Sequence, residues 1–79
     1  MSKDDLPTYA IVELLIRLSE EYPLIGNYKD HAFHEYGIIV KTTNGHINLP
    51  VSLVLQQFNK PGLITKAELN TVANYFKIY

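Results

Sequence analysis

Cysteine is absent from this 79-residue chain, and its absence removes several classes of protein at once. Without cysteine there is no disulfide scaffold, no cysteine-ligated zinc finger and no thiol nucleophile. Charged residues are also few, at 19% of the chain, while 47% of the residues are hydrophobic. This balance is too apolar for a disordered chain, so we expect one small folded domain.

Long apolar runs are absent as well. The longest, residues 10–18, is interrupted by Glu13 and Arg17, so we predict no membrane span. Residues 1–5 are polar and acidic where a signal peptide would be basic, and we interpret them as a flexible tail. The net charge of −1 disfavours a dedicated binder of polyanions. We therefore expect a cytoplasmic protein that does not bind membranes.

Glycine and serine are too sparse to build the common catalytic loops. The four glycines stand singly, so the chain has neither a dinucleotide-binding motif nor a P-loop. Ser2 lies in the tail, and neither Ser19 nor Ser52 lies in a glycine-rich turn, which argues against a nucleophilic triad. No pair of carboxylates is placed for acid–base chemistry. We predict that the protein is not an enzyme and uses no cofactor.

The first predicted element is a helix over residues 6–22. Asp4 or Asp5 can cap it, Pro7 suits its first turn, and Tyr22 ends it because the residue before a proline avoids the helical region. With about 100° between successive residues, one face of this helix gathers five apolar side chains: Ile11, Leu14, Leu15, Leu18 and Tyr22.

This helix has an unusually wide apolar surface. Three more apolar side chains continue the face: Tyr9, Val12 and Ile16. The remaining polar strip is narrow and consists of Ala10, Glu13, Arg17, Glu20 and Glu21. An ordinary surface helix carries one narrower apolar stripe. The helix is therefore either central to the fold or shared with a partner.

Residues 24–33 are predicted to form a loop. Gly26, Asn27 and Asp30 interrupt the apolar pattern there. The segment is long for so small a domain, and long ordered loops carry function more often than short ones.

A β-hairpin is the clearest local signal. Asn44-Gly45 lies between two runs of alternating polarity and predicts a two-residue type I′ turn, which pairs Thr43 with His46 and Val40 with Leu49. One face of the hairpin is then the core face: Tyr36, Ile38, Val40, Thr42, Ile47 and Leu49. The other face is exposed to solvent: Glu35, Ile39, Lys41, Thr43, His46 and Asn48.

Two helices are predicted after the hairpin. Apolar residues recur at helical spacing over residues 50–58, although a third strand remains an alternative because the segment is rich in valine and leucine. Thr65 and Glu68 form a capping box that opens a last helix over residues 65–78. The predicted fold class is α+β in the order α-β-β-α-α, a single domain in which a two-stranded antiparallel hairpin packs on helices.

The histidines suggest a metal site or an enzymatic centre as one alternative function. His31 and His34 are three residues apart, with Asp30 and Glu35 beside them. In an extended segment, however, residues three apart point to opposite faces, and His46 lies at the far end of the hairpin. We predict surface histidines and no bound metal.

DNA binding is the stronger alternative, because a helix pair follows the hairpin. The second helix would be the recognition helix, with four polar residues that can contact bases or phosphates: Lys66, Asn70, Asn74 and Lys77. The connection between the two helices is longer than in the usual helix-turn-helix motif.

The favoured function is binding to a protein partner, as an inhibitor, an adaptor or a homodimeric regulator. Six residues are the predicted contact residues: Tyr9, Val12, Ile16, Tyr28, Tyr75 and Tyr79. Tyrosine suits an interface because it buries a large area and keeps a polar end. The alternative is that these side chains simply complete a tyrosine-rich core.

Overall fold

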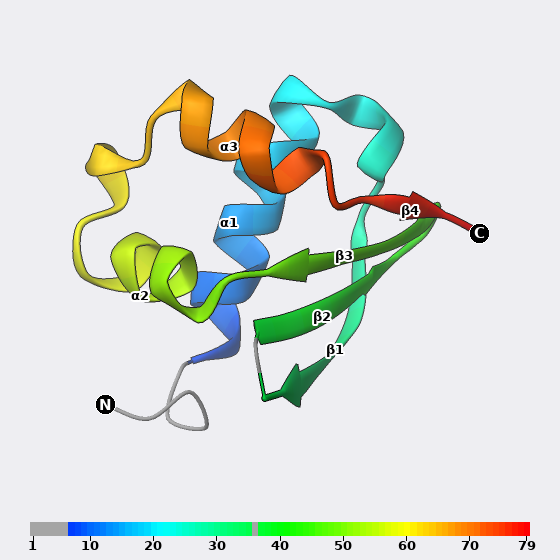
Figure 1. Ribbon diagram of the computed structural model, residues 1–79, viewed down its shortest axis with the longest axis horizontal. Helices are drawn as coiled ribbons and strands as arrows, with labels where there is room; N and C mark the ends of the chain where they lie inside the picture. The colour runs from blue at the N-terminus through cyan, green and yellow to red at the C-terminus, as the bar shows by residue number, and fades with distance from the viewer. Residues whose placement is uncertain (1–6, 36) are drawn as a thin grey trace.

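The computed structural model describes residues 7–35 and 37–79, which fold into three α-helices and a four-stranded antiparallel sheet (Figure 1). Two short 3₁₀ turns, η2 and η3, lie in the connections. In chain order the elements are α1 (Thr8–Glu21), η2 (Pro23–Ile25), β1 (Tyr28–His34), β2 (Gly37–Thr42), β3 (Gly45–Leu49), α2 (Val51–Asn59), η3 (Pro61–Leu63), α3 (Lys66–Ala73) and β4 (Lys77–Ile78). The predicted mixture of helices and antiparallel strands is confirmed, but the predicted number of strands is wrong.

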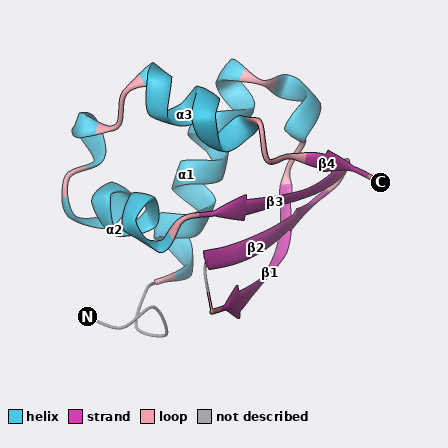
Figure 2. Ribbon diagram, in the orientation of Figure 1, coloured by secondary structure: helices cyan, strands magenta, loops and turns pink. Residues whose placement is uncertain are grey.

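The sheet has the strand order β1-β2-β3-β4, so three consecutive strands form a meander and β4 joins its far edge. Figure 2 shows the helices gathered on one side of this sheet. Residues 24–33, predicted as a loop, in fact contain most of β1. The prediction failed because β1 is an edge strand with one exposed face, where polar side chains need no apolar neighbours.

Helix α1 is central to the fold. Its predicted apolar face is confirmed, since Ile11, Leu14, Leu15 and Leu18 are buried. Ala10 is buried as well, so its assignment to the polar strip was wrong. Pro7 occupies the N-cap position, one residue before the first turn. The predicted capping residues and the predicted tail lie outside the described residues.

Two side chains in the polar strip of α1 contact other parts of the fold instead of facing only water. Arg17 donates from Nη2 to the carbonyl of Ile64 at 3.0 Å and from Nη1 to Gln57 Oε1 at 3.5 Å. Gln57, which is 5% exposed, donates in turn to Glu13 Oε2 at 3.4 Å. A buried amide is stable only when such partners satisfy it, so these contacts join α1 to α2 and to the segment before α3.

The hairpin of β2 and β3 has the predicted faces and a different register. Lys41 pairs with His46 and Ile38 with Leu49, so the pairing is shifted by two residues from the prediction. The core-face prediction is confirmed for its described members, because strand side chains alternate and a shift of two preserves the faces: Ile38, Val40, Thr42, Ile47 and Leu49 are all buried. Tyr36 lies outside the described residues.

The predicted type I′ turn is also wrong. Such a turn needs a positive φ at both central residues, and among the described residues only Gly26 has one, at 86°. Gly45 is required for another reason, because a Cβ on it would overlap the carbonyl of Lys77. The glycine thus lets β4 approach β3, which the Asn-Gly pattern could not indicate.

The second half of the chain contains the two predicted helices. The segment after Pro50 is helical, not a third strand. The capping box is confirmed: Thr65 Oγ1 accepts from the Glu68 amide at 3.2 Å, and Glu68 Oε1 accepts from the Thr65 amide at 3.2 Å. The last helix ends at Ala73 instead of continuing to residue 78, because the chain turns there and β4 pairs with β3.

Candidate functional site

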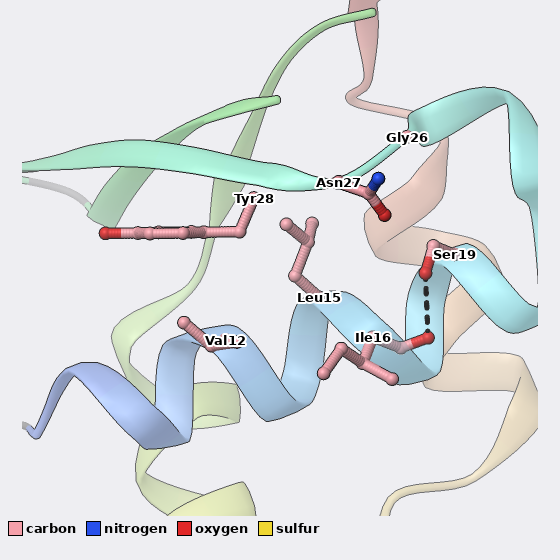
Figure 3. Close-up of a pocket in the computed structure, with 7 residues that line it drawn as sticks. All are labelled: Val12, Leu15, Ile16, Ser19, Gly26, Asn27 and Tyr28. Atoms are coloured by element: carbon pink, nitrogen blue, oxygen red, sulfur yellow. Dashed lines mark hydrogen bonds between the residues drawn. The ribbon is translucent and has the colours of Figure 1, made fainter. Parts of the chain in front are cut away.

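A hollow of about 190 Å³ lies between α1 and the start of β1 (Figure 3). It is mainly apolar and brings together three of the predicted contact residues, Val12, Ile16 and Tyr28. The lining residues are Val12, Leu15, Ile16 and Ser19 from α1, and Gly26, Asn27 and Tyr28 from the chain that enters β1. Figure 3 shows the Tyr28 ring extended along the strand above Val12, with Ile16 on the helix side.

The strand side of this hollow is shaped by Gly26 and Asn27. Gly26 has a φ of 86°, and a Cβ there would overlap Oγ1 of Thr43. The same Thr43 hydroxyl oxygen accepts from the Asn27 amide at 3.0 Å, and the Thr43 amide donates to the Asn27 carbonyl at 2.9 Å. A left-handed glycine and two hydrogen bonds therefore hold the chain at the mouth of the hollow.

The helix side of the hollow leads to an exposed apolar strip on α1. Ile16 is 50% exposed, and Tyr9 is 56% exposed with its ring 6.0 Å from that of Phe58. Val12, between them along the helix, is half-buried. The extra apolar side chains of the helix thus do two things: Val12 and Ile16 line the hollow, and Tyr9 and Ile16 continue it onto the surface.

The inner row of β1 consists of aromatic and imidazole rings. The Tyr28 hydroxyl lies 2.6 Å from His31 Nδ1, and the His31 ring meets Phe33 edge-on with centroids 5.3 Å apart. Burial, and then the negative charge of Asp30, raise the pKa of the Tyr28 phenol. Tyr28 therefore keeps its proton, and its hydroxyl shares a hydrogen bond with His31 Nδ1.

Exposed carboxylates border the helix side of the hollow. Glu13 and Glu20 are both exposed and lie three residues before and four residues after Ile16. Residues at these spacings are neighbours on one helical face. On the strand side Lys29 is exposed, next to the irregular pairing between Tyr28 and Asp30. Glu13 Oε2 already accepts from Gln57 of α2 at 3.4 Å, so within the described residues Glu20 is the carboxylate beside Ile16 for which no such contact is seen.

The other two predicted contact residues, Tyr75 and Tyr79, lie elsewhere. Tyr75 lines a second, wider hollow of about 370 Å³ on the outer side of the sheet, together with His46 and Lys77. The Tyr79 ring lies 6.2 Å from the ring of His46. The structure therefore divides the six predicted residues between two surfaces.

The histidines do not form one site. His31 lies on the inner row of β1 with Tyr28 and Phe33, whereas His34 lines the outer hollow with His46. Within residues 7–35 and 37–79, no group of three or more histidine, aspartate or glutamate side chains is placed to hold a metal ion.

The four residues of the DNA-binding alternative do not share one helix. Lys66 and Asn70 lie on α3, Asn74 is its C-cap and Lys77 belongs to β4. Asn70 Oδ1 accepts from the Tyr22 hydroxyl at 2.8 Å. The helix predicted over residues 65–78 ends at Ala73, so these four residues do not lie along one helix.

Four residues of the hollow were missed by sequence reasoning, namely Leu15, which was assigned to the core, and Ser19, Gly26 and Asn27. In the structure His31 and Phe33 alternate with exposed neighbours, as strand residues do, but the sequence Asp30-His31-Ala32-Phe33-His34 has no matching alternation of apolar and polar residues. The irregular pairing before Asp30 hides the same alternation at Tyr28.

No family model matches this chain, and neither a curated protein nor a solved structure matches it. Across the part of the chain that the structure describes, no helix combines the length and the apolar character needed to cross a membrane. The support for a function therefore comes from the geometry of the site.

Proposed function

We propose that this protein is a non-catalytic interaction module that binds a protein partner through the surface of α1 and β1. The observation that carries the proposal is the apolar hollow between these elements, with the half-exposed Ile16 on its border. Large exposed apolar side chains beside a hollow are typical of binding surfaces, because a partner can insert a side chain there.

The size of the surface favours a protein as the ligand. The hollow is small, but the strip of Tyr9 and Ile16 extends it along the helix, and the β1 edge extends it along the sheet. A standard interface covers about 800 Å² on each partner. That is about a sixth of the 4795 Å² that this chain exposes.

Substitution of Ile16 by glutamate tests the proposal. Ile16→Glu places a carboxylate where the partner is expected to bury an apolar side chain, so affinity should fall by about tenfold to a hundredfold. Ile16 is already 50% exposed, so the fold should persist, which circular dichroism can check. The matched control is Leu63→Glu, at an apolar residue of η3 that is 60% exposed and does not line the hollow.

The readout is capture of proteins from nuclease-treated lysate by the tagged chain and by the two variants. The proposal expects a stoichiometric protein that is retained by the Leu63→Glu variant and lost by the Ile16→Glu variant. Identical capture by all three chains would contradict it. DNA recovered before nuclease treatment would instead favour the DNA-binding hypothesis, which remains a prediction.

A further inference from the structure

Helix α1 runs beside the start of β1 and carries an apolar ledge there (Figure 3). Val12 and Ile16 line the hollow under Tyr28, and Tyr9 continues the ledge along the helix. In the described part of the chain, β1 pairs only with β2, so the other side of its backbone faces away from the sheet. A strand that pairs on one side only, beside an apolar surface, can pair with one more strand whose side chains cover that surface.

We propose that the partner contributes an extended segment that pairs with β1 as a fifth strand and places an apolar side chain in the hollow. This proposal rests on the proposed function and specifies its partner. Strand addition uses backbone hydrogen bonds for affinity and pockets for alternate side chains for specificity. The regular pairing of β1 with β2 runs from Asp30 to His34. Within this stretch the His31 amide donates to Asp30 Oδ1 at 2.8 Å, so the Asp30 carboxylate has to turn away before an added strand can use that amide.

The inner row of β1 determines which side of the added segment is apolar. Tyr28, His31 and Phe33 face the helices or the hollow, and a strand beside them presents every second side chain to the same side. Those side chains would cover Val12 and Ile16. The partner segment therefore alternates, with apolar residues toward α1 and polar residues toward solvent.

The acidic residue beside Ile16 indicates a basic residue in the partner segment. Glu20 is exposed and lies four residues after Ile16, a spacing that puts their Cβ atoms about 5–6 Å apart. Two residues of an extended strand span about 6.6 Å, so a lysine or arginine two positions from the apolar anchor can reach a glutamate. A second copy of this chain is a poorer occupant, because a two-fold contact would bring the Glu20 carboxylates of both copies to the same interface.

A library of random ten-residue peptides, panned against the full chain, tests this chemistry. The expected peptides carry an apolar residue with a lysine or arginine two positions away. Glu20→Gln should weaken a selected peptide about twofold to fivefold and reduce the salt dependence of its affinity. Glu21→Gln is the matched control, because Glu21 lies 4.0 Å from Lys66 and does not border Ile16.

N-methylated forms of the selected peptide test the strand itself. Only alternate amides of an added strand donate to β1, so methylation of one alternating set should cost at least about tenfold in affinity. Methylation of the other set should be tolerated. Full tolerance at every position, or a bound peptide that is helical by circular dichroism, would overturn strand addition.

The remaining outcomes separate the two proposals. If lysate capture depends on Ile16 but no selected peptide does, the partner protein binds without an added strand, and only the present inference fails. If neither depends on Ile16, the proposed function fails as well. Selected peptides without basic residues overturn the charge argument. Dimerisation of the chain that Ile16→Glu abolishes would make a second copy the occupant and overturn the partner segment.

Discussion

The buried hydroxyl of Thr42 provides a quantitative test of how the sheet joins the helical layer. Its Oγ1 donates to the Ile25 carbonyl at 2.6 Å and accepts from the amides of Gly45 at 3.1 Å and Asn44 at 3.3 Å. The Thr42 side chain is fully buried. Oγ1 also lies 3.2 Å from the Gly45 carbonyl, a second and longer acceptor for the hydroxyl proton. Thr42→Val keeps the shape of the side chain and removes all of these hydrogen bonds.

The expected cost follows from the groups that lose their partner. Ile25 and Gly45 are buried residues, so the Ile25 carbonyl and the Gly45 amide cannot bond to water once the hydroxyl is gone. Each buried group left without a hydrogen bond costs about 1–3 kcal/mol. The buried methyl group that replaces the hydroxyl offsets about 1 kcal/mol of this cost. We expect Thr42→Val to lower the free energy of unfolding by about 3 kcal/mol. For a chain of this length that lowers the melting temperature by about 18 °C.

Urea denaturation followed by circular dichroism measures this change. Thr42→Ser keeps the hydroxyl and loses only a methyl group, so it should cost about 1 kcal/mol and remain folded if the valine variant does not. Thr71→Val is the matched control on an exposed face of α3, with an expected change within about 0.5 kcal/mol. The reasoning is refuted if the serine variant is less stable than the valine variant, or if the valine variant is unchanged.

Two further predictions concern β4 and the edge strand. Gly45→Ala forces a Cβ against the Lys77 carbonyl, so β4 should detach, its amides should lose protection from hydrogen exchange, and unfolding should become easier by about 1–3 kcal/mol. Gly62→Ala, with open space around the new Cβ, should be nearly neutral, and equal effects in both variants would contradict the account. Because the pKa of Tyr28 is raised above its usual 10.0, its contribution to stability is fully present below pH 10.0 and is lost as the pH rises through the folded-state pKa. Between about pH 9 and 11, the urea midpoint of the Tyr28→Phe variant should therefore fall less steeply with rising pH than that of the unsubstituted chain. Parallel curves for the two proteins would count against this assignment.

The helices and the hairpin faces could be predicted because their signals are local. The spacing of Leu14 and Leu18 identifies the buried face of α1, and the Thr65–Glu68 capping box marks the start of α3. The hairpin register could not be predicted from the turn, because Gly45 serves the approach of β4 and not the turn geometry. The predicted core and solvent faces are nevertheless correct, because the observed register differs from the predicted one by two residues and strand side chains alternate between faces.

Strands β1 and β4 could not be predicted because distant residues determine them. Lys77 and Ile78 continue a helical pattern in the sequence, but they pair with His46 and Gly45 of β3. Tertiary pairing thus overrides the local pattern. In β1 a histidine, His31, occupies an inward position, where its contacts with Tyr28 and Phe33 make it compatible with the inner face.

The candidate site could be predicted in part. The excess apolar width of the first helix indicated Val12 and Ile16, and the structure places both beside Tyr28. Tyr75 and Tyr79 were grouped with them by residue type alone, and residue type does not determine position. Their place on the other surface follows from the early end of α3 and the return of the chain along β3.

The unequal edges of the sheet limit the number of chains that can join it. β4 has two residues, whereas β1 has seven, so only one edge is long enough to template another strand. A sheet with two such edges can polymerise, because every added molecule exposes a new edge. On the proposed strand addition, each molecule would accept one strand at β1, and growth through the sheet would end after that single addition. The short final strand would in that case keep the sheet from growing into fibres.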